Sequence, residues 1–253
     1  MMSAIYRNAT LVRVWLGREK DDSRNAFKTL HNIQTFYPSG GPWRSNRSKH
    51  LLYIPEHTWR AISRLLYRTY WSRIWIVQEL ILAQEIILHC GEDEMNWCCF
   101  EFFLVELEPA RLLVDKAINP RAQVPGYIMD ALIKDSPAER LSRRRKLGQS
   151  HTLLSLMQDC IDFQASDPRD KIFALLGLAS DAKQKIEVDY NKSLEEVKEM
   201  VAVHFRGMEK WSGWSRKSLF YRTSKQGFQE FPEFHLIEEF IPSQREYRFE
   251  ELD

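Results

Sequence analysis

One acidic residue lies where a buried helix is expected. Glu79 follows Trp75 by four residues, within a stretch over residues 70–83 that is apolar almost throughout. Side chains four positions apart lie on the same side of a helix, so the indole and the carboxylate would be neighbours. A buried carboxylate is costly unless it is paired, hydrogen-bonded or open to a cleft. Glu79 is therefore either half of a structural ion pair or the acid of a functional site.

A second group of charged residues opens a later apolar segment, in the run Asp167-Pro168-Arg169-Asp170. Asp167 can cap a helix, and Pro168 suits the first helical position. Asp170 can return a hydrogen bond three residues on, as in a capping box. A helix cap is the simplest interpretation, although Arg169 could instead pair with an acid in the core.

Other arrangements suited to chemistry are absent from the sequence. Adjacent Cys98 and Cys99, with His89 and Cys90 nearby, lack the spacing of zinc ligands and indicate core cysteines. The chain contains no Gly-rich phosphate loop, no G-x-S-x-G and no H-E-x-x-H. The sequence therefore predicts no resident metal or cofactor.

Composition and charge restrict the class of protein. The 253 residues are 44% hydrophobic and 12% aromatic, enough for a packed core. A net charge of +1 gives no electrostatic footprint for nucleic acid. The basic run over residues 140–146 most simply forms a solvated loop or helix face, with nuclear import or an anion site as alternatives. No apolar run approaches the ~20 residues of a membrane span, no signal peptide is evident and cysteines are few, so we expect a cytoplasmic protein.

The hydrophobic pattern predicts an α/β protein. Buried strands are expected over residues 9–17 and 85–91, and residues 1–7 resemble the end of a helix whose beginning lies upstream. Helices are expected over residues 21–36, 55–68, 70–83, 100–114, 151–163, 168–178 and 193–205, with a weaker pattern over 124–138. A Pro- and Gly-rich loop is expected over residues 37–53. The pattern decays beyond Gly207, where no element is assigned.

Three segments in fixed order carry a recognisable pattern. They are residues 5–17, which end in V-W-L-G, residues 71–79, which match W-x-R-x-W-x-x-Q-E, and residues 167–178, which match D-P-R-D-K-x-x-A-L-L-G-L. The pattern resembles the fungal heterokaryon-incompatibility (HET) domain and its downstream region, over roughly residues 5–205. The family's N-terminal half has no counterpart here, so we expect further coding sequence upstream of Met1.

The resemblance implies a fold and a division of the chain. HET domains are regarded as distant relatives of TIR domains, with a flavodoxin-like parallel sheet flanked by helices. The expected fold is an incomplete version of that sheet, followed by a mostly helical C-terminal region. The expected divisions are residues 1–96 for the HET half-domain, 97–206 for the helical region and 207–253 for a tail of uncertain order.

The resemblance also implies a function in fungal non-self recognition and incompatibility cell death. Some TIR domains cleave NAD⁺ with the glutamate of a W-x-x-x-E helix, a spacing that Trp75 and Glu79 match. Glu79 is thereby implied as the catalytic residue, with Trp75 and Trp71 as substrate-binding residues and NAD⁺ as a possible substrate. Structural roles are expected for the remaining motif residues, Arg73, Gln78, Asp167, Arg169 and Asp170.

The implied chemistry needs only one acid. Cleavage of the ribosyl–nicotinamide bond passes through an oxocarbenium-like state, which a nearby carboxylate stabilises. The alternative is that Glu79 forms an ion pair with one of three arginines, Arg68, Arg73 or Arg169. The chain would then be a non-catalytic interaction module or a truncated remnant, with protein partners or self-association through exposed core strands.

Overall fold

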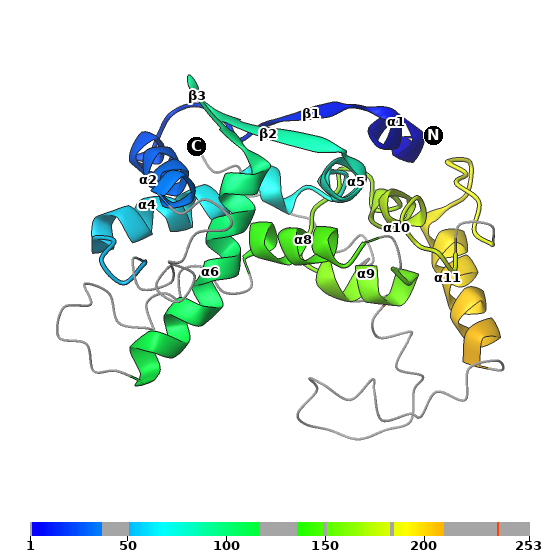
Figure 1. Cartoon of the computed structure of the whole chain (residues 1–253). Helices are drawn as coiled ribbons and strands as arrows, with labels where there is room; N and C mark the ends of the chain where they lie inside the picture. The colour runs from blue at the N-terminus through cyan, green and yellow to red at the C-terminus, as the bar shows by residue number, and fades with distance from the viewer. Residues whose placement is uncertain are drawn as a thin grey trace. The chain divides into compact units, whose positions relative to one another are not determined.

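The protein divides into two compact units, residues 1–148 and residues 149–253. A computed structural model of the chain describes residues 2–36, 51–116, 136–148, 151–182, 185–209 and residue 237 (Figure 1). Three predicted segments lie largely outside these residues. They are the loop over 37–53, the weak helical pattern over 124–138 and the tail beyond residue 209. Each unit is described by itself.

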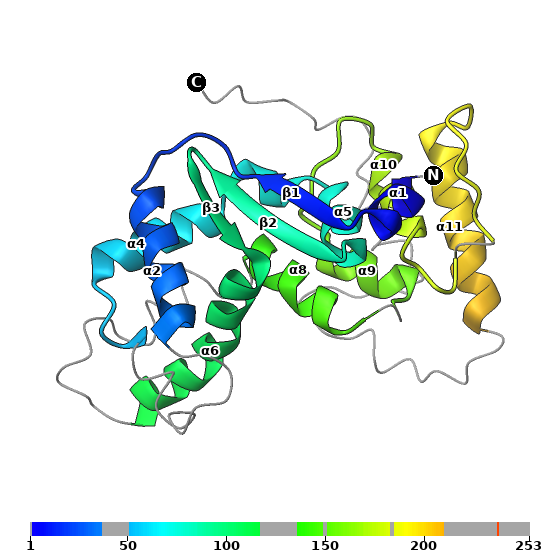
Figure 2. The ribbon, with the colours of Figure 1, turned by 45° about the horizontal axis from the view of Figure 1, so that its top comes forward.

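The first unit contains a small sheet and the helices that pack on it. Its elements are α1 (Met2–Asn8), β1 (Leu11–Trp15), α2 (Ser23–Phe36), α4 (Glu56–Leu66), the 3-10 turn η2 (Thr69–Ser72), α5 (Ile76–Leu82), β2 (Glu85–Cys90), β3 (Asp93–Asn96), α6 (Trp97–Lys116) and α8 (Pro137–Lys146). Figures 1 and 2 show α2 and α6 on the same side of the sheet, where both helices contact β3. The predicted α/β class is confirmed.

The three strands form a mixed sheet in the order β1-β2-β3 (Figure 2). β1 and β2 are parallel, with Leu11 opposite Glu85, and β3 runs antiparallel to β2. The reversal between β2 and β3 passes through Gly91 at φ +59, where a Cβ would lie 2.9 Å from the Cβ of Glu19. Glycine is therefore needed for both the backbone conformation and the close approach. The predicted parallel sheet is correct for β1 and β2 and wrong for β3, a short hairpin strand of mostly polar residues.

The two faces of the sheet differ in burial. The alternation of strand side chains places Val12, Val14, Ile86, Leu88 and Met95 in the core. On the other face of β1, Leu11 is partly buried, Arg13 is exposed and Trp15 is 54% exposed, so the expectation of a buried strand holds for one face only. One face of the sheet thus carries the core of the unit, and the other carries an exposed indole.

The continuous helix predicted over residues 70–83 is wrong in its first half. Residues 69–72 form η2, Arg73 has extended backbone angles, and α5 begins only at Ile76. The ring of Trp71 stacks on Phe100 with centroids 5.6 Å apart, and its Nε1 donates to the Leu65 carbonyl at 2.8 Å. These tertiary contacts outweigh the local helical pattern.

The second unit is helical, as predicted, with α9 (Leu153–Asp159), α10 (Asp170–Leu176) and α11 (Leu194–Glu209). The helix expected over residues 193–205 is confirmed and begins with a capping box: Ser193 N donates to Glu196 Oε2 at 2.7 Å, and Glu196 N donates to Ser193 Oγ at 3.3 Å. The family-based boundary between residues 96 and 97 stays a prediction. By packing, α6 contacts the sheet and α8 contacts α4, α5 and α6, and both helices lie in the first unit. No helix in the described ranges is long and apolar enough to cross a membrane.

Candidate functional site

The partners of Glu79 are tyrosine hydroxyls. Glu79 is half-buried in the first turn of α5, and Tyr70 Oη donates a hydrogen bond to its Oε2 at 2.9 Å. Tyr6 faces the same carboxylate from α1. Burial, the charge of Glu79 and hydrogen bonding to it raise the pKa of Tyr6 to about 12, and the same causes raise the pKa of Tyr70 further. Both phenols are therefore protonated donors at neutral pH.

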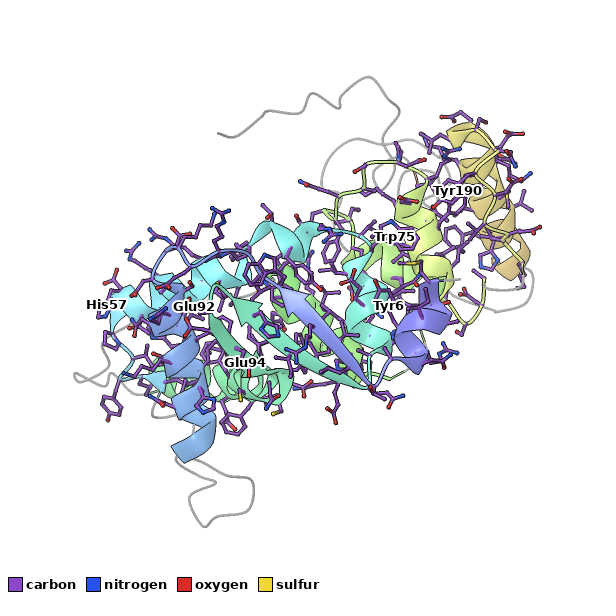
Figure 3. The ribbon with its side chains drawn as sticks, turned by 90° about the horizontal axis from the view of Figure 1, so that it is seen from above. Tyr6, His57, Trp75, Glu92, Glu94 and Tyr190 are labelled. Carbon is purple, nitrogen blue, oxygen red and sulfur yellow. The ribbon has the colours of Figure 1, made fainter. Side chains whose placement is uncertain are left out.

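Two elements bring these tyrosines to Glu79. Helix α1 packs against α5, and Figure 3 shows Tyr6 on α1 beside α5, with Trp75 at the start of that helix. The side-chain amide of Gln84 donates to the Arg7 carbonyl at 3.4 Å, a second link between the two segments. Tyr70 comes from η2 and is buried with its ring edge against Trp71. The break in the predicted helix is thus what allows Tyr70 to turn toward Glu79.

Two of the three arginines expected to pair with Glu79 have other partners. Arg68 donates to the carbonyls of Arg18 and Lys20, each at 2.9 Å. The predicted ion pair of Arg68 with Glu79 is therefore wrong, and the ion pair that Arg169 forms is with Asp167, inside its own unit. Arg73 is exposed, and its positive charge partly offsets the rise in the pKa of Tyr6 and of Tyr70. Arg73 thus lies close enough to the tyrosine pair to act on it through space.

The two tryptophans expected to bind substrate have different environments. Trp71 is fully buried and its N–H is hydrogen-bonded to backbone, so the structure gives it a packing role. Trp75 is partly exposed at the N-cap position of α5, one turn before Glu79. Gln78 is buried, and the structural role expected for it stays a prediction. Of the two tryptophans of the W-x-R-x-W motif, Trp75 is the one whose side chain is partly exposed.

A basic side chain holds the C-terminal end of α5. Arg145, on α8, donates to the carbonyls of Leu80, Ala83 and Gln84. Burial lowers the pKa of Arg145, while the charge of Glu101 opposes that change. The prediction of a solvated basic run over residues 140–146 is therefore wrong for Arg145, because the end of α5 supplies unpaired carbonyls.

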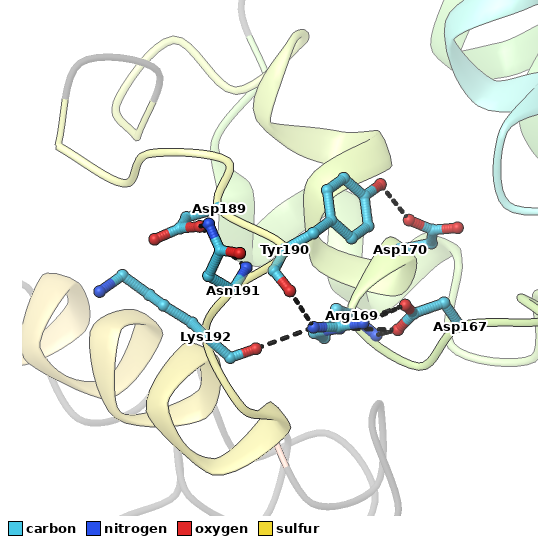
Figure 4. A network of polar contacts seen from close by, with 7 residues as sticks. All are labelled: Asp167, Arg169, Asp170, Asp189, Tyr190, Asn191 and Lys192. Carbon is cyan, nitrogen blue, oxygen red and sulfur yellow. Dashed lines mark hydrogen bonds and ion pairs between the residues drawn. The ribbon is translucent and has the colours of Figure 1, made fainter.

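The motif arginine of the second unit forms a clasp between two segments (Figure 4). Arg169 binds Asp167 through Nε–Oδ1 at 3.0 Å and Nη2–Oδ2 at 2.6 Å. Its Nη1 donates to the carbonyls of Tyr190 and Lys192 at 2.7 and 2.9 Å. Hydrogen bonds from Arg169 hold the pKa of Asp167 below its usual range. We call Asp167, Arg169, Asp170, Tyr190 and Lys192 the Arg169 clasp.

The helix cap predicted for Asp167–Asp170 differs from the observed contacts in two details. Helix α10 begins at Asp170, and Asp167 accepts from Arg169 N at 2.9 Å within the turn that precedes the helix. Asp170 accepts from the hydroxyl of Tyr190 at 2.5 Å instead of bonding back to the cap. The partner of Arg169 is the partly exposed Asp167 and not a core acid.

Sequence reasoning missed three residues around Glu79, namely Tyr6, Tyr70 and Arg145. The tyrosines lie at no diagnostic spacing from Glu79, and only the high cost of an unpaired acid pointed to donors of some kind. Arg145 was visible only as a member of a basic run. In the part of the chain that the structure describes, no group of three or more His, Cys, Asp or Glu side chains could hold a metal ion.

Comparisons with known proteins agree with the motifs. Residues 1–79, up to and including Glu79, match the family model of the heterokaryon incompatibility protein (HET). The chain is 25% identical, over 235 residues, to heterokaryon incompatibility protein 6, OR allele, of Neurospora crassa. That match covers 76% of this chain and 33% of the relative, so the chain spans about a third of the length of this curated relative. No solved structure matches the chain. The predicted resemblance to HET domains is confirmed by the match over residues 1–79.

Proposed function

We propose that this chain acts in fungal heterokaryon incompatibility, the non-self recognition that follows fusion of fungal cells. The HET match over residues 1–79 and the similarity to the Neurospora incompatibility protein support this role. The cellular outcome that we propose is programmed cell death, as the resemblance to HET domains implies.

We further propose that Glu79 carries a TIR-like cleavage of NAD⁺. The observation that supports this role is a half-buried carboxylate held by tyrosine hydroxyls instead of by a cation. Its negative charge is therefore not cancelled and can stabilise a positive ribosyl group. The C1′–N bond breaks with its electron pair on nicotinamide, and water then adds to C1′ and releases a proton. Trp75 offers an aromatic face for the cationic pyridinium ring of the substrate.

The experiment is NAD⁺ consumption by purified protein, with nicotinamide release measured by chromatography. We expect Glu79→Gln to lower the rate by about 100-fold or more, because it removes the charge and keeps the side-chain size. Glu56→Gln is the matched control, since Glu56 is an exposed carboxylate paired with Arg60 on α4. A parent rate no higher than that of Glu79→Gln would exclude the enzymatic proposal.

The second candidate function is a non-catalytic interaction module. Two exposed apolar side chains support it, because Trp15 of β1 is 54% exposed and Ile5 of α1 is 61% exposed. In this case the parent self-associates as its concentration rises, and Trp15→Ser weakens the association. Sedimentation velocity measures both, and a parent that stays monomeric at high concentration would argue against self-association.

A further inference from the structure

The guanidinium of Arg145 is surrounded by acceptors at one end of one helix. It contacts the carbonyl of Leu80 and donates to the carbonyls of Ala83 and Gln84 at 2.7 and 3.1 Å. The last carbonyls of a helix have no partner within the helix, and they carry its negative partial charge. A half-buried cation at this position satisfies several of them together.

Helix α5 depends on such outside contacts. It has only seven residues, Ile76–Leu82, too few for a helix to be stable by itself. Glu79 lies directly before Leu80, whose carbonyl Arg145 contacts. Any loosening of this end of α5 would therefore change the position of the carboxylate.

Arg145 is also linked through Gln84 to the segment that carries Tyr6. The carbonyl of Gln84 accepts from Arg145, and the amide of Gln84 donates to the carbonyl of Arg7. Arg7 follows Tyr6, which faces Glu79 from α1. The same cation thus orders the segment that carries the acid and the segment that carries one of its donors.

We propose that Arg145 is a positioning residue that fixes Glu79 against Tyr6 and Tyr70 by holding the C-terminal end of α5. The effect of Arg145 on kcat rests on the proposed NAD⁺ cleavage. Its effect on the position of Glu79 and on the stability of α5 does not. The basic run of residues 140–146 then contains a residue with a distinct role, which its exposed neighbour Lys146 does not share.

The test compares Arg145→Ala and Arg145→Lys with Lys146→Ala, a matched loss of charge at the next position of α8. The first readout is the side-chain carboxyl carbon resonance of Glu79, assigned by its absence in Glu79→Gln. The second is amide hydrogen exchange over residues 76–84, compared with exchange in β1 and β2. Both are repeated with guanidinium added far below denaturing concentrations, and kcat and KM for NAD⁺ are measured on the same samples.

We expect Arg145→Ala to shift the Glu79 resonance, to speed exchange over residues 76–84 by about tenfold and to leave β1 and β2 unchanged. Added guanidinium restores both readouts. Arg145→Lys falls between parent and Arg145→Ala, because one ammonium cannot reach all three carbonyls. The kcat falls by about tenfold while KM stays near the parent value.

An unchanged Glu79 resonance in Arg145→Ala would overturn the inference. Faster exchange that extends equally to β1 and β2 would do the same, because it would indicate a general loss of fold. If the parent releases no nicotinamide, the proposed enzymatic function fails. The Glu79 resonance and its recovery with guanidinium then decide the role of Arg145 without reference to turnover.

Discussion

At the scale of single residues, Glu79 is defined by its hydrogen-bond donors. A phenol donates a hydrogen bond without cancelling the charge of the carboxylate, whereas an arginine partner would have neutralised the pair. Tyr70 Oη lies 2.9 Å from Glu79 Oε2, and Tyr6 approaches from a separate helix. This arrangement holds the carboxylate in place through hydrogen-bond donors that carry no charge.

The raised pKa of Tyr6 predicts a loss of stability at high pH. The folded protein keeps the Tyr6 proton up to a pKa of about 12, against 10.0 for an ordinary tyrosine. Between these values the unfolded chain releases a proton that the folded chain retains, so the free energy of unfolding falls as pH rises from 10 to 12. Urea midpoints measured on both sides of pH 10 check this, with Tyr6→Phe as the comparison.

We expect the decline above pH 10 to be shallower in Tyr6→Phe than in the parent, because one of the phenols with a raised pKa, which include Tyr70 and Tyr190, has been removed. A decline of equal slope in both proteins would contradict the contact between Tyr6 and Glu79. The decline does not vanish in Tyr6→Phe, since the pKa of Tyr70 is raised even further.

At the scale of elements, short sequence patterns predicted the features that depend on contacts between neighbouring residues. The Ser193 capping box and the strands β1 and β2 follow from patterns within a few residues, whereas the parallel pairing of the two strands was implied by the resemblance to HET domains. The break between η2 and α5 could not be predicted, because it depends on Trp71 meeting Phe100 on a helix almost thirty positions later. The spacing of Trp75 and Glu79 predicted an indole and an acid one helical turn apart. The tyrosines that face Glu79 come from α1 and η2, and no sequence spacing predicts that these elements approach α5.

The capping box of α11 gives a prediction at this scale. Replacing Ser193 by Ala removes the side-chain oxygen that accepts from Glu196 N and donates to Glu196 Oε2. We expect the free energy of unfolding of the second unit to fall by about 1 kcal/mol. Chemical denaturation measures the change, with Ser166→Ala as a control at an exposed position. Equal losses in both variants would mean that the cap contributes nothing specific.

At the scale of the whole molecule, each motif is completed inside one compact unit. The tyrosines that face Glu79 come from α1 and η2, and Arg145 of α8 binds the end of the helix that carries it; all three elements lie within residues 1–148. The Arg169 clasp is formed entirely within residues 149–253. The W-x-R-x-W-x-x-Q-E motif and the downstream D-P-R-D motif thus lie in different units.

Separate expression of residues 1–148 tests this independence. We expect the fragment to unfold cooperatively and to keep the Glu79 environment, because every partner named for Glu79 lies within it. Circular dichroism during thermal unfolding and the carboxyl carbon resonance of Glu79 provide the measurements. A fragment without a cooperative transition would show that the second unit is required for the first to fold.

The parallel pairing of β1 with β2 has a consequence for the order of folding. Leu11 and Glu85 lie opposite each other but are 74 positions apart in the chain. Closing so long a loop costs entropy before any strand contact compensates for it, so this pairing forms slowly compared with the neighbouring helices. During synthesis, β1 leaves the ribosome long before its partner strand exists. An apolar strand is therefore unprotected in the nascent chain, and this interval is when chaperones have most reason to bind.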